Sequence, residues 1–82
     1  MAGCLLLSRG LTRAQIMQKT MGNHGIRSSI VRPPREIAVD GCGYAVRVEE
    51  ETLSRAKTVL RNNHINTTRI YRETPWGYDV IQ

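Results

Sequence analysis

The sequence predicts an α+β fold with the element order β-α-β-β-α-β. Four short apolar or alternating runs predict strands, and two longer segments with apolar residues at helical spacing predict helices. A faint internal repeat supports this order, because Asn23-His24 and Asn63-His64 stand at the ends of the two predicted helices. Two βαβ halves of similar size are typical of the ferredoxin-like fold, which has a four-stranded antiparallel sheet with two helices on one face.

The first half of the chain contains a buried strand, a helix and a second strand. The apolar run Cys4–Ser8 predicts a strand that is buried on both faces. Thr12 and Gln15 have the spacing of a capping box, so Thr12 is the expected N-cap of the helix, and the glycines after it are expected to end it. Weak alternation over residues 26–31 predicts the second strand, and Pro33-Pro34 ends it.

The second half repeats the pattern with clearer signals. Residues 44–49 alternate between apolar and polar side chains, which predicts a half-buried third strand. The acidic run Glu49-Glu50-Glu51 is favourable at a helix N-terminus, and apolar residues at helical spacing follow it. Residues 67–72 are the expected last strand, so residues 1–73 are expected to form one domain.

The C-terminal tail, residues 74–82, lies outside these six elements. It contains Trp76, the single tryptophan of the chain. The favoured interpretation is that the tail folds back over an open edge or face of the sheet. The alternative is a docking or self-association segment, because exposed aromatic side chains often mark interfaces.

Size and charge limit the classes of function. The chain has 82 residues and a net charge of +5, and residues 1–35 contain six cationic and no acidic side chains. This asymmetry favours an anionic partner, such as nucleic acid, phosphate or a charged sulfur or selenium species, although it also fits solubility alone. No apolar run is long enough to cross a membrane and no signal peptide is recognisable, so we expect a cytoplasmic protein without a membrane partner.

Cys42 is the candidate reactive residue. It stands between Gly41 and Gly43 at the start of the predicted third strand, where a large partner can approach the thiol. In the expected fold this point lies beside the end of the first strand, while Cys4 lies about 13 Å away at the far end. A disulfide between them is therefore not expected, and Cys4 is interpreted as a core residue. The cysteine and histidine spacings match no zinc motif, so we expect no metal or cofactor.

Positive charge is expected to surround Cys42. The N-terminus of the first helix and four arginines would favour the thiolate and lower the pKa of the thiol, with Glu36 and Asp40 opposing them. The candidate anion-stabilising arginines are Arg9, Arg13, Arg32 and Arg35. Gly41 and Gly43 either form a backbone nest for an anion or only make the turn into the strand.

The segment before and after Cys42 carries a family resemblance. Arg32-Pro33-Pro34-Arg35-Glu36-Ile37, the Gly41-Cys42-Gly43 turn and the strand that follows resemble a family of small bacterial selenium/sulfur carrier-like domains, over residues 3 to about 72. The resemblance implies a sulfur or selenium carrier in which Cys42 holds the cargo. The chain departs from the family pattern at Ala38, where a serine is common, and Val39-Asp40 lengthens the approach to the cysteine.

Three functions remain open at this point. The leading hypothesis is a carrier or relay that receives a chalcogen atom from a donor protein and passes it to an acceptor, rather than a free-standing enzyme, because no general base or metal cluster is recognisable. A small basic RNA-binding module is less favoured, since the central strands offer only Tyr44 for base stacking. The third is a protein-interaction module, including a homodimer through strand edges or the Trp76 tail.

Overall fold

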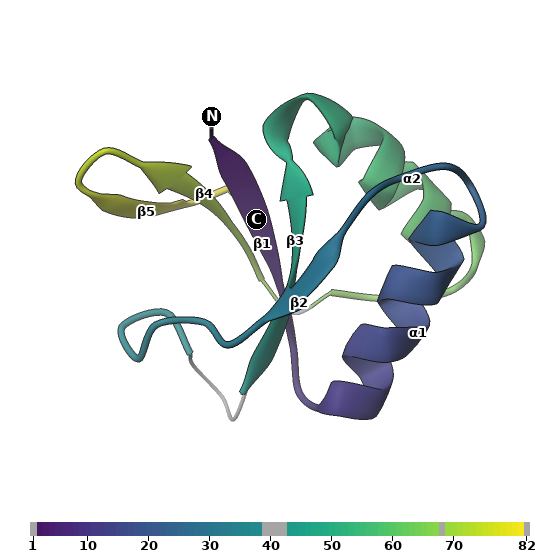
Figure 1. The fold of residues 1–82 in the computed structure, drawn as a ribbon, viewed down its shortest axis with the longest axis horizontal. Helices are drawn as coiled ribbons and strands as arrows, with labels where there is room; N and C mark the ends of the chain where they lie inside the picture. The colour runs from purple at the N-terminus through teal and green to yellow at the C-terminus, as the bar shows by residue number, and fades with distance from the viewer. Residues whose placement is uncertain (1, 39–42, 68, 82) are drawn as a thin grey trace.

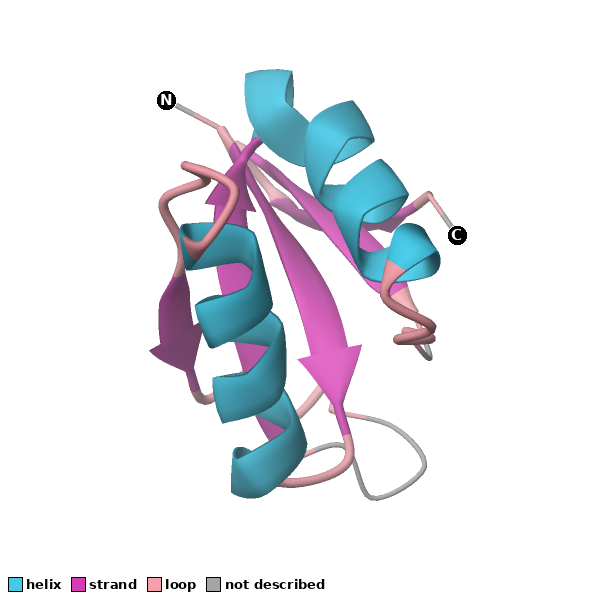
Figure 2. Ribbon diagram, turned by 90° about the vertical axis from the view of Figure 1, so that its right-hand side faces the viewer, coloured by secondary structure: helices cyan, strands magenta, loops and turns pink. Residues whose placement is uncertain are grey.

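The computed structural model of the chain describes residues 2–38, 43–67 and 69–81. Its elements are β1 (Gly3–Ser8), α1 (Leu11–Gly22), β2 (Ser29–Val31), β3 (Tyr44–Glu49), the short 3-10 helix η1 (Glu50–Thr52), α2 (Leu53–Asn62), β4 (Ile70–Thr74) and β5 (Gly77–Val80). The strands form one sheet of order β2-β3-β1-β4-β5, and every neighbouring pair is antiparallel (Figure 1). Both α-helices cover the same face of this sheet (Figure 2).

The expected four-stranded ferredoxin-like arrangement is wrong, because the sheet has a fifth strand. The tail forms β5, which pairs antiparallel with β4 in a register that runs from Thr74 opposite Gly77 to Tyr71 opposite Val80. A two-residue turn, Pro75-Trp76, joins the two strands. The expectation that the tail covers an open sheet edge is confirmed, and it does so as a strand because β4 would otherwise leave unpaired backbone groups there.

The strand β1 is the centre of the molecule. It pairs with β3 on one side and β4 on the other, and every one of its residues is buried. Its alternate side chains point to opposite faces, so it contributes to two apolar clusters. Leu6 joins the cluster under the helices, with residues such as Met17 and Ile70. Leu7 joins a smaller cluster on the other face.

The face opposite the helices is covered in part by the chain between β2 and β3. Ile37 from this segment is buried against Leu5, Leu7 and Ala45. The segment turns back at Pro34, whose carbonyl accepts hydrogen bonds from the N–H groups of the third and fourth residues after it. Figure 1 shows this segment on the side of the sheet away from α1 and α2.

The helix α1 begins earlier than its sequence signal indicates. The N-cap is Gly10, with no side-chain cap, so the expected role of Thr12 as N-cap is wrong. The buried Ser8 shapes this turn, since its hydroxyl donates to the carbonyl of Gly10 at 2.9 Å and accepts from the N–H of Gly10 at 3.4 Å. The glycines end the helix as expected, with Gly25 at φ 77° and the N–H of Ile26 bonded to the carbonyl of Met21.

Candidate functional site

The end of β1 and the start of β3 lie side by side. Ser8 is the register partner of Tyr44, so the start of β3 lies beside the turn that follows β1. Cys42 and Gly41, the first two candidate site residues, lie outside the described residues, as does Asp40. The described chain resumes at Gly43, where a Cβ atom would meet no heavy atom within 4 Å. Among the described residues, none would therefore obstruct a side chain at position 43.

Arg9 and Arg13 line one cavity at this end of the sheet. The cavity has a volume of about 350 Å³ and is lined by Leu7, Ser8, Arg9, Arg13, Asn66 and Thr67. Both arginines are exposed, and Arg13 donates a hydrogen bond from Nη2 to the carbonyl of Asn66 at 3.1 Å. Among the described residues, two arginines and no carboxylate line this space, so these residues favour an anion.

Arg32 lies at the same end of the sheet, on the β3 side. The pairing of Val31 with Ala45 brings the residue after β2 next to the start of β3. The guanidinium carbon of Arg32 stands 4.7 Å from the centroid of the Tyr44 ring, and its Nη1 donates to the Tyr44 hydroxyl at 3.3 Å. A cation–π contact combined with a hydrogen bond holds this positive charge at the residue next to Gly43.

Arg35 is the fourth candidate arginine. It lies in the turn that carries Ile37 onto the face of the sheet opposite the helices, and its side chain is exposed. It does not line the cavity that contains Arg9 and Arg13. The structure thus brings Arg9 and Arg13 together in one cavity, places Arg32 at the start of β3, and places Arg35 in the exposed turn before Ile37.

The loop between α2 and β4 contributes residues that sequence reasoning missed. Asn66 and Thr67 line the cavity with Arg13, and they also line a neighbouring cavity of about 140 Å³ that includes Lys57 and Arg61. The signal was partly present, because a helix that ends near Asn62 must be followed by a loop that returns the chain to the sheet. The pairing of Ile70 with Leu6 is needed to show that this loop lies at the end of the sheet where β1 ends.

The interpretation of Cys4 as a core residue is confirmed. Its side chain is fully buried in the cluster under the helices, and its thiol is free. Burial raises the pKa of the Cys4 thiol, and the nearby charge of Glu50 raises it further. A buried, protonated thiol is a poor nucleophile, so this cysteine is unsuited to exchange chemistry.

Cys4 is therefore expected to resist alkylation until the protein unfolds. In the Cys42→Ser variant, where Cys4 holds the only thiol, iodoacetamide should modify the native protein at least about 100-fold more slowly than the denatured protein, because the reagent needs an opening of the core. Time-resolved mass spectrometry with and without denaturant measures both rates. Equal rates in the two conditions would contradict the buried position of the sulfur.

Comparison with known proteins found a matching protein family. A family model described as "Putative Se/S carrier protein-like" matches residues 4–72, which is most of the chain. The searches of curated proteins and of solved structures each returned no match. Within the described part of the chain, neither helix has the length and apolar character needed to span a membrane.

Proposed function

We propose that this chain, which belongs to the family of Se/S carrier-like proteins, carries a sulfur or selenium atom on the thiol of Cys42. The family match spans the arginine-proline segment, Cys42 and all of β3. Of the two cysteines, Cys4 is buried in the core, which leaves Cys42 as the thiol for this role.

One structural observation supports the proposal above the others: three arginines lie near the end of β1 and the start of β3. Arg9 and Arg13 share a cavity there, and Arg32 is held against Tyr44. A thiolate, a persulfide and a perselenide are all anionic near neutral pH, so the same charges favour the attacking and the loaded forms. Gly41 and Gly43 would leave room for a partner to reach the sulfur.

The proposed exchange conserves atoms and electrons in both steps. In loading, the Cys42 thiolate attacks the outer chalcogen of a donor persulfide or sulfenylselenide, a new bond forms to Cys42, and the donor thiolate leaves. In unloading, a nucleophile on the acceptor attacks that outer atom and the Cys42 thiolate leaves. Neither step needs an external oxidant or reductant, which suits a relay without its own cofactor.

The partners in this proposal are a donor protein and an acceptor protein. Arg35, an exposed residue of the turn before Ile37, contributes positive charge to the bound anion together with Arg9, Arg13 and Arg32 in this proposal. We assign the exchange to the cytoplasm, where thiols are kept reduced and a carrier cysteine stays available.

RNA binding is a weaker explanation of the same basic end. Sheets that bind RNA stack bases on exposed aromatic rings. Tyr44 is the one aromatic residue on the two central strands, and its ring is half-buried and covered by the guanidinium of Arg32. The cationic end therefore lacks a free stacking platform on those strands.

Loading with a small persulfide donor tests the proposal. Intact-mass spectrometry should show that the wild-type protein gains one sulfur atom, that Cys42→Ser gains none, and that the matched variant Cys4→Ala loads fully. Replacing Arg9 and Arg13 by glutamine should slow loading by about 3- to 10-fold, because two nearby positive charges are lost. Loading that persists in Cys42→Ser, or a wild-type protein that does not load, would refute the carrier role.

A further inference from the structure

The β4–β5 hairpin exposes the largest apolar side chain of the protein. Trp76, in the turn of the hairpin, is 87% exposed, whereas the next most exposed large hydrophobic residue among those described, Val80, is 53% exposed. A tryptophan side chain can bury about 200 Å² in a core or an interface, and an exposed one leaves that area in water. An exposed side chain of this kind adds little to the stability of the fold. Exposed aromatic residues are typical of interfaces.

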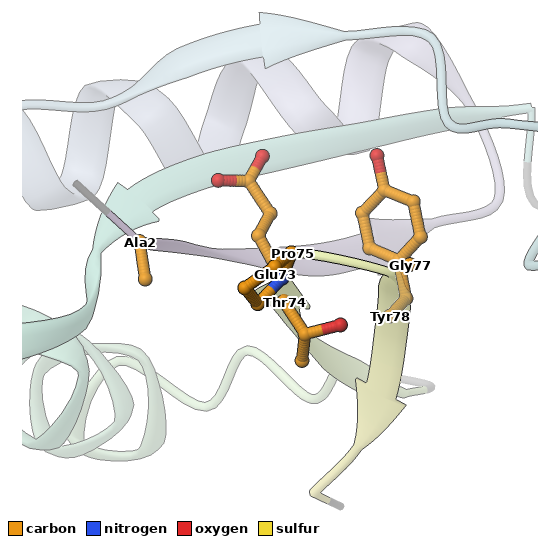
Figure 3. Close-up of a pocket in the computed structure, with 6 residues that line it drawn as sticks. All are labelled: Ala2, Glu73, Thr74, Pro75, Gly77 and Tyr78. Carbon is orange, nitrogen blue, oxygen red and sulfur yellow. The ribbon is translucent and has the colours of Figure 1, made fainter.

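A cavity lies beside the same turn. It has a volume of about 530 Å³ and is lined by Ala2, Glu73, Thr74, Pro75, Gly77 and Tyr78. All of these residues except Ala2 belong to the hairpin, and four of them are within two positions of Trp76 in the chain. Figure 3 shows the side chains of Glu73 and Tyr78 on one side of the hairpin, with Ala2 close to the start of β1.

The position of Trp76 next to this cavity indicates that a second copy of the chain fills the cavity. In a two-fold symmetric dimer, the same patch of both subunits meets at the axis, so a projecting group and its receiving cavity must lie next to each other on one surface. Trp76 and this cavity satisfy that condition within a single hairpin. A different partner protein would need only one of the two features.

We propose that two copies of this chain associate about a two-fold axis through their β4–β5 hairpins, with Trp76 of each copy in the cavity of the other. The volume is sufficient for an indole ring. Two tryptophans bury about 400 Å², which is well below the about 1,200–2,000 Å² that stable, specific interfaces bury. The dimer is therefore weak and reversible.

The position of the hairpin keeps the dimer separate from the cationic end. The β4–β5 turn lies beyond the point where β4 passes the beginning of β1, while the cavity with Arg9 and Arg13 lies where β1 ends. Each copy in the dimer would leave its own cationic end open. This inference does not depend on the carrier role, and a failure of one leaves the other intact.

The single tryptophan makes the test direct, because its emission reports on Trp76 alone. Sedimentation velocity and fluorescence, both followed from about 1 μM to about 1 mM, cover the range of weak interfaces. We expect the mass to change from monomer to dimer and the emission maximum to shift to shorter wavelength over the same concentrations. A monomer throughout, or a dimer without an emission shift, would overturn the proposal.

Three variants separate this interface from other contacts. Trp76→Ala should remain monomeric at every concentration, and it should fold normally because the side chain is exposed. Ala2→Arg, which fills the cavity but leaves Trp76 in place, should weaken dimerisation at least about 10-fold. Ile16→Ala, a matched loss of an exposed apolar side chain on α1, should dimerise like the wild type. Dimerisation of Trp76→Ala at wild-type strength would place the interface elsewhere.

Discussion

Replacing Leu6 by alanine is expected to lower the free energy of unfolding by about 3 to 5 kcal/mol. Leu6 is fully buried on the central strand, where its register partners are Val46 and Ile70 on the two neighbouring strands. Its side chain packs in the cluster that both helices cover. Truncation removes apolar burial and leaves a cavity that a sheet paired on both sides cannot close by relaxing.

The loss is large compared with the stability of a domain of this size. A chain of 82 residues is expected to have a total stability of about 5 to 10 kcal/mol, so Leu6→Ala should leave it near the limit of folding. Urea denaturation followed by circular dichroism measures the difference. Leu11→Ala, which truncates a leucine that is 42% exposed, serves as the control and should change stability by less than about 0.5 kcal/mol. Similar losses in both variants would contradict the burial of Leu6.

Replacing Arg47 by methionine is expected to cost about 2 kcal/mol at neutral pH. Arg47 donates two hydrogen bonds to the carboxylate of Glu73, from Nη2 at 2.9 Å and from Nε at 3.1 Å, and lies 3.5 Å from an oxygen of Glu49. It passes directly over Gly3, where a Cβ atom would stand 2.5 Å from its guanidinium carbon. Without Arg47, the half-buried carboxylates of Glu49 and Glu73 on either side of Gly3 would lose the guanidinium group that pairs with both.

The cost of Arg47→Met should depend on pH. The hydrogen bonds from Arg47 hold the pKa of Glu73 below its ordinary value of 4.5. A carboxyl group whose pKa is lower in the folded state stabilises the protein fully above its unfolded-state pKa, and this contribution is lost as pH falls through the folded-state pKa. The difference in the free energy of unfolding between the wild type and Arg47→Met should therefore decrease progressively below about pH 4.5. Denaturation at a series of pH values measures this convergence.

Two further variants isolate the ion pair. Arg69→Met removes an exposed arginine and should change stability little at any pH. In a Glu73→Gln background, Arg47→Met should cost less than it does in the wild type, because the charge that Arg47 compensates is already gone. A penalty for Arg47→Met that is the same at pH 7 and at pH 3 would show that packing, and not charge, explains it.

The sequence predicted which strands and helices form better than it predicted the residues at which they begin and end. The alternation in residues 44–49 and the apolar run before Arg9 correspond to β3 and β1, because side-chain periodicity follows directly from backbone geometry. The capping signal at Thr12 was misleading, since Ser8 folds back onto Gly10 and starts the helix there. The second strand is shorter than its alternation indicated and covers only Ser29–Val31.

The candidate site was predicted in part. The proximity of Arg9 and Arg13 follows from their positions on either side of the helix start, because Arg9 precedes the N-cap Gly10 and Arg13 lies in the first turn, and both line one cavity. The contact of Arg32 with Tyr44 and the burial of Ile37 on the face opposite the helices were not predicted, because both depend on how the segment between β2 and β3 crosses the sheet. Asn66 could not be assigned to the site from the sequence, since its contact with Arg13 joins residues far apart in the chain.

The order of strands and helices up to residue 74 was determined by the sequence alone, because each of those elements carries its own periodic pattern of apolar side chains. The fifth strand, the pairing of Arg47 with Glu73 and the cavity beside Trp76 were decided only by the tertiary structure. Each depends on which strands become neighbours and which edge stays unpaired. Those are properties of contacts between distant residues, and no short window of sequence encodes them.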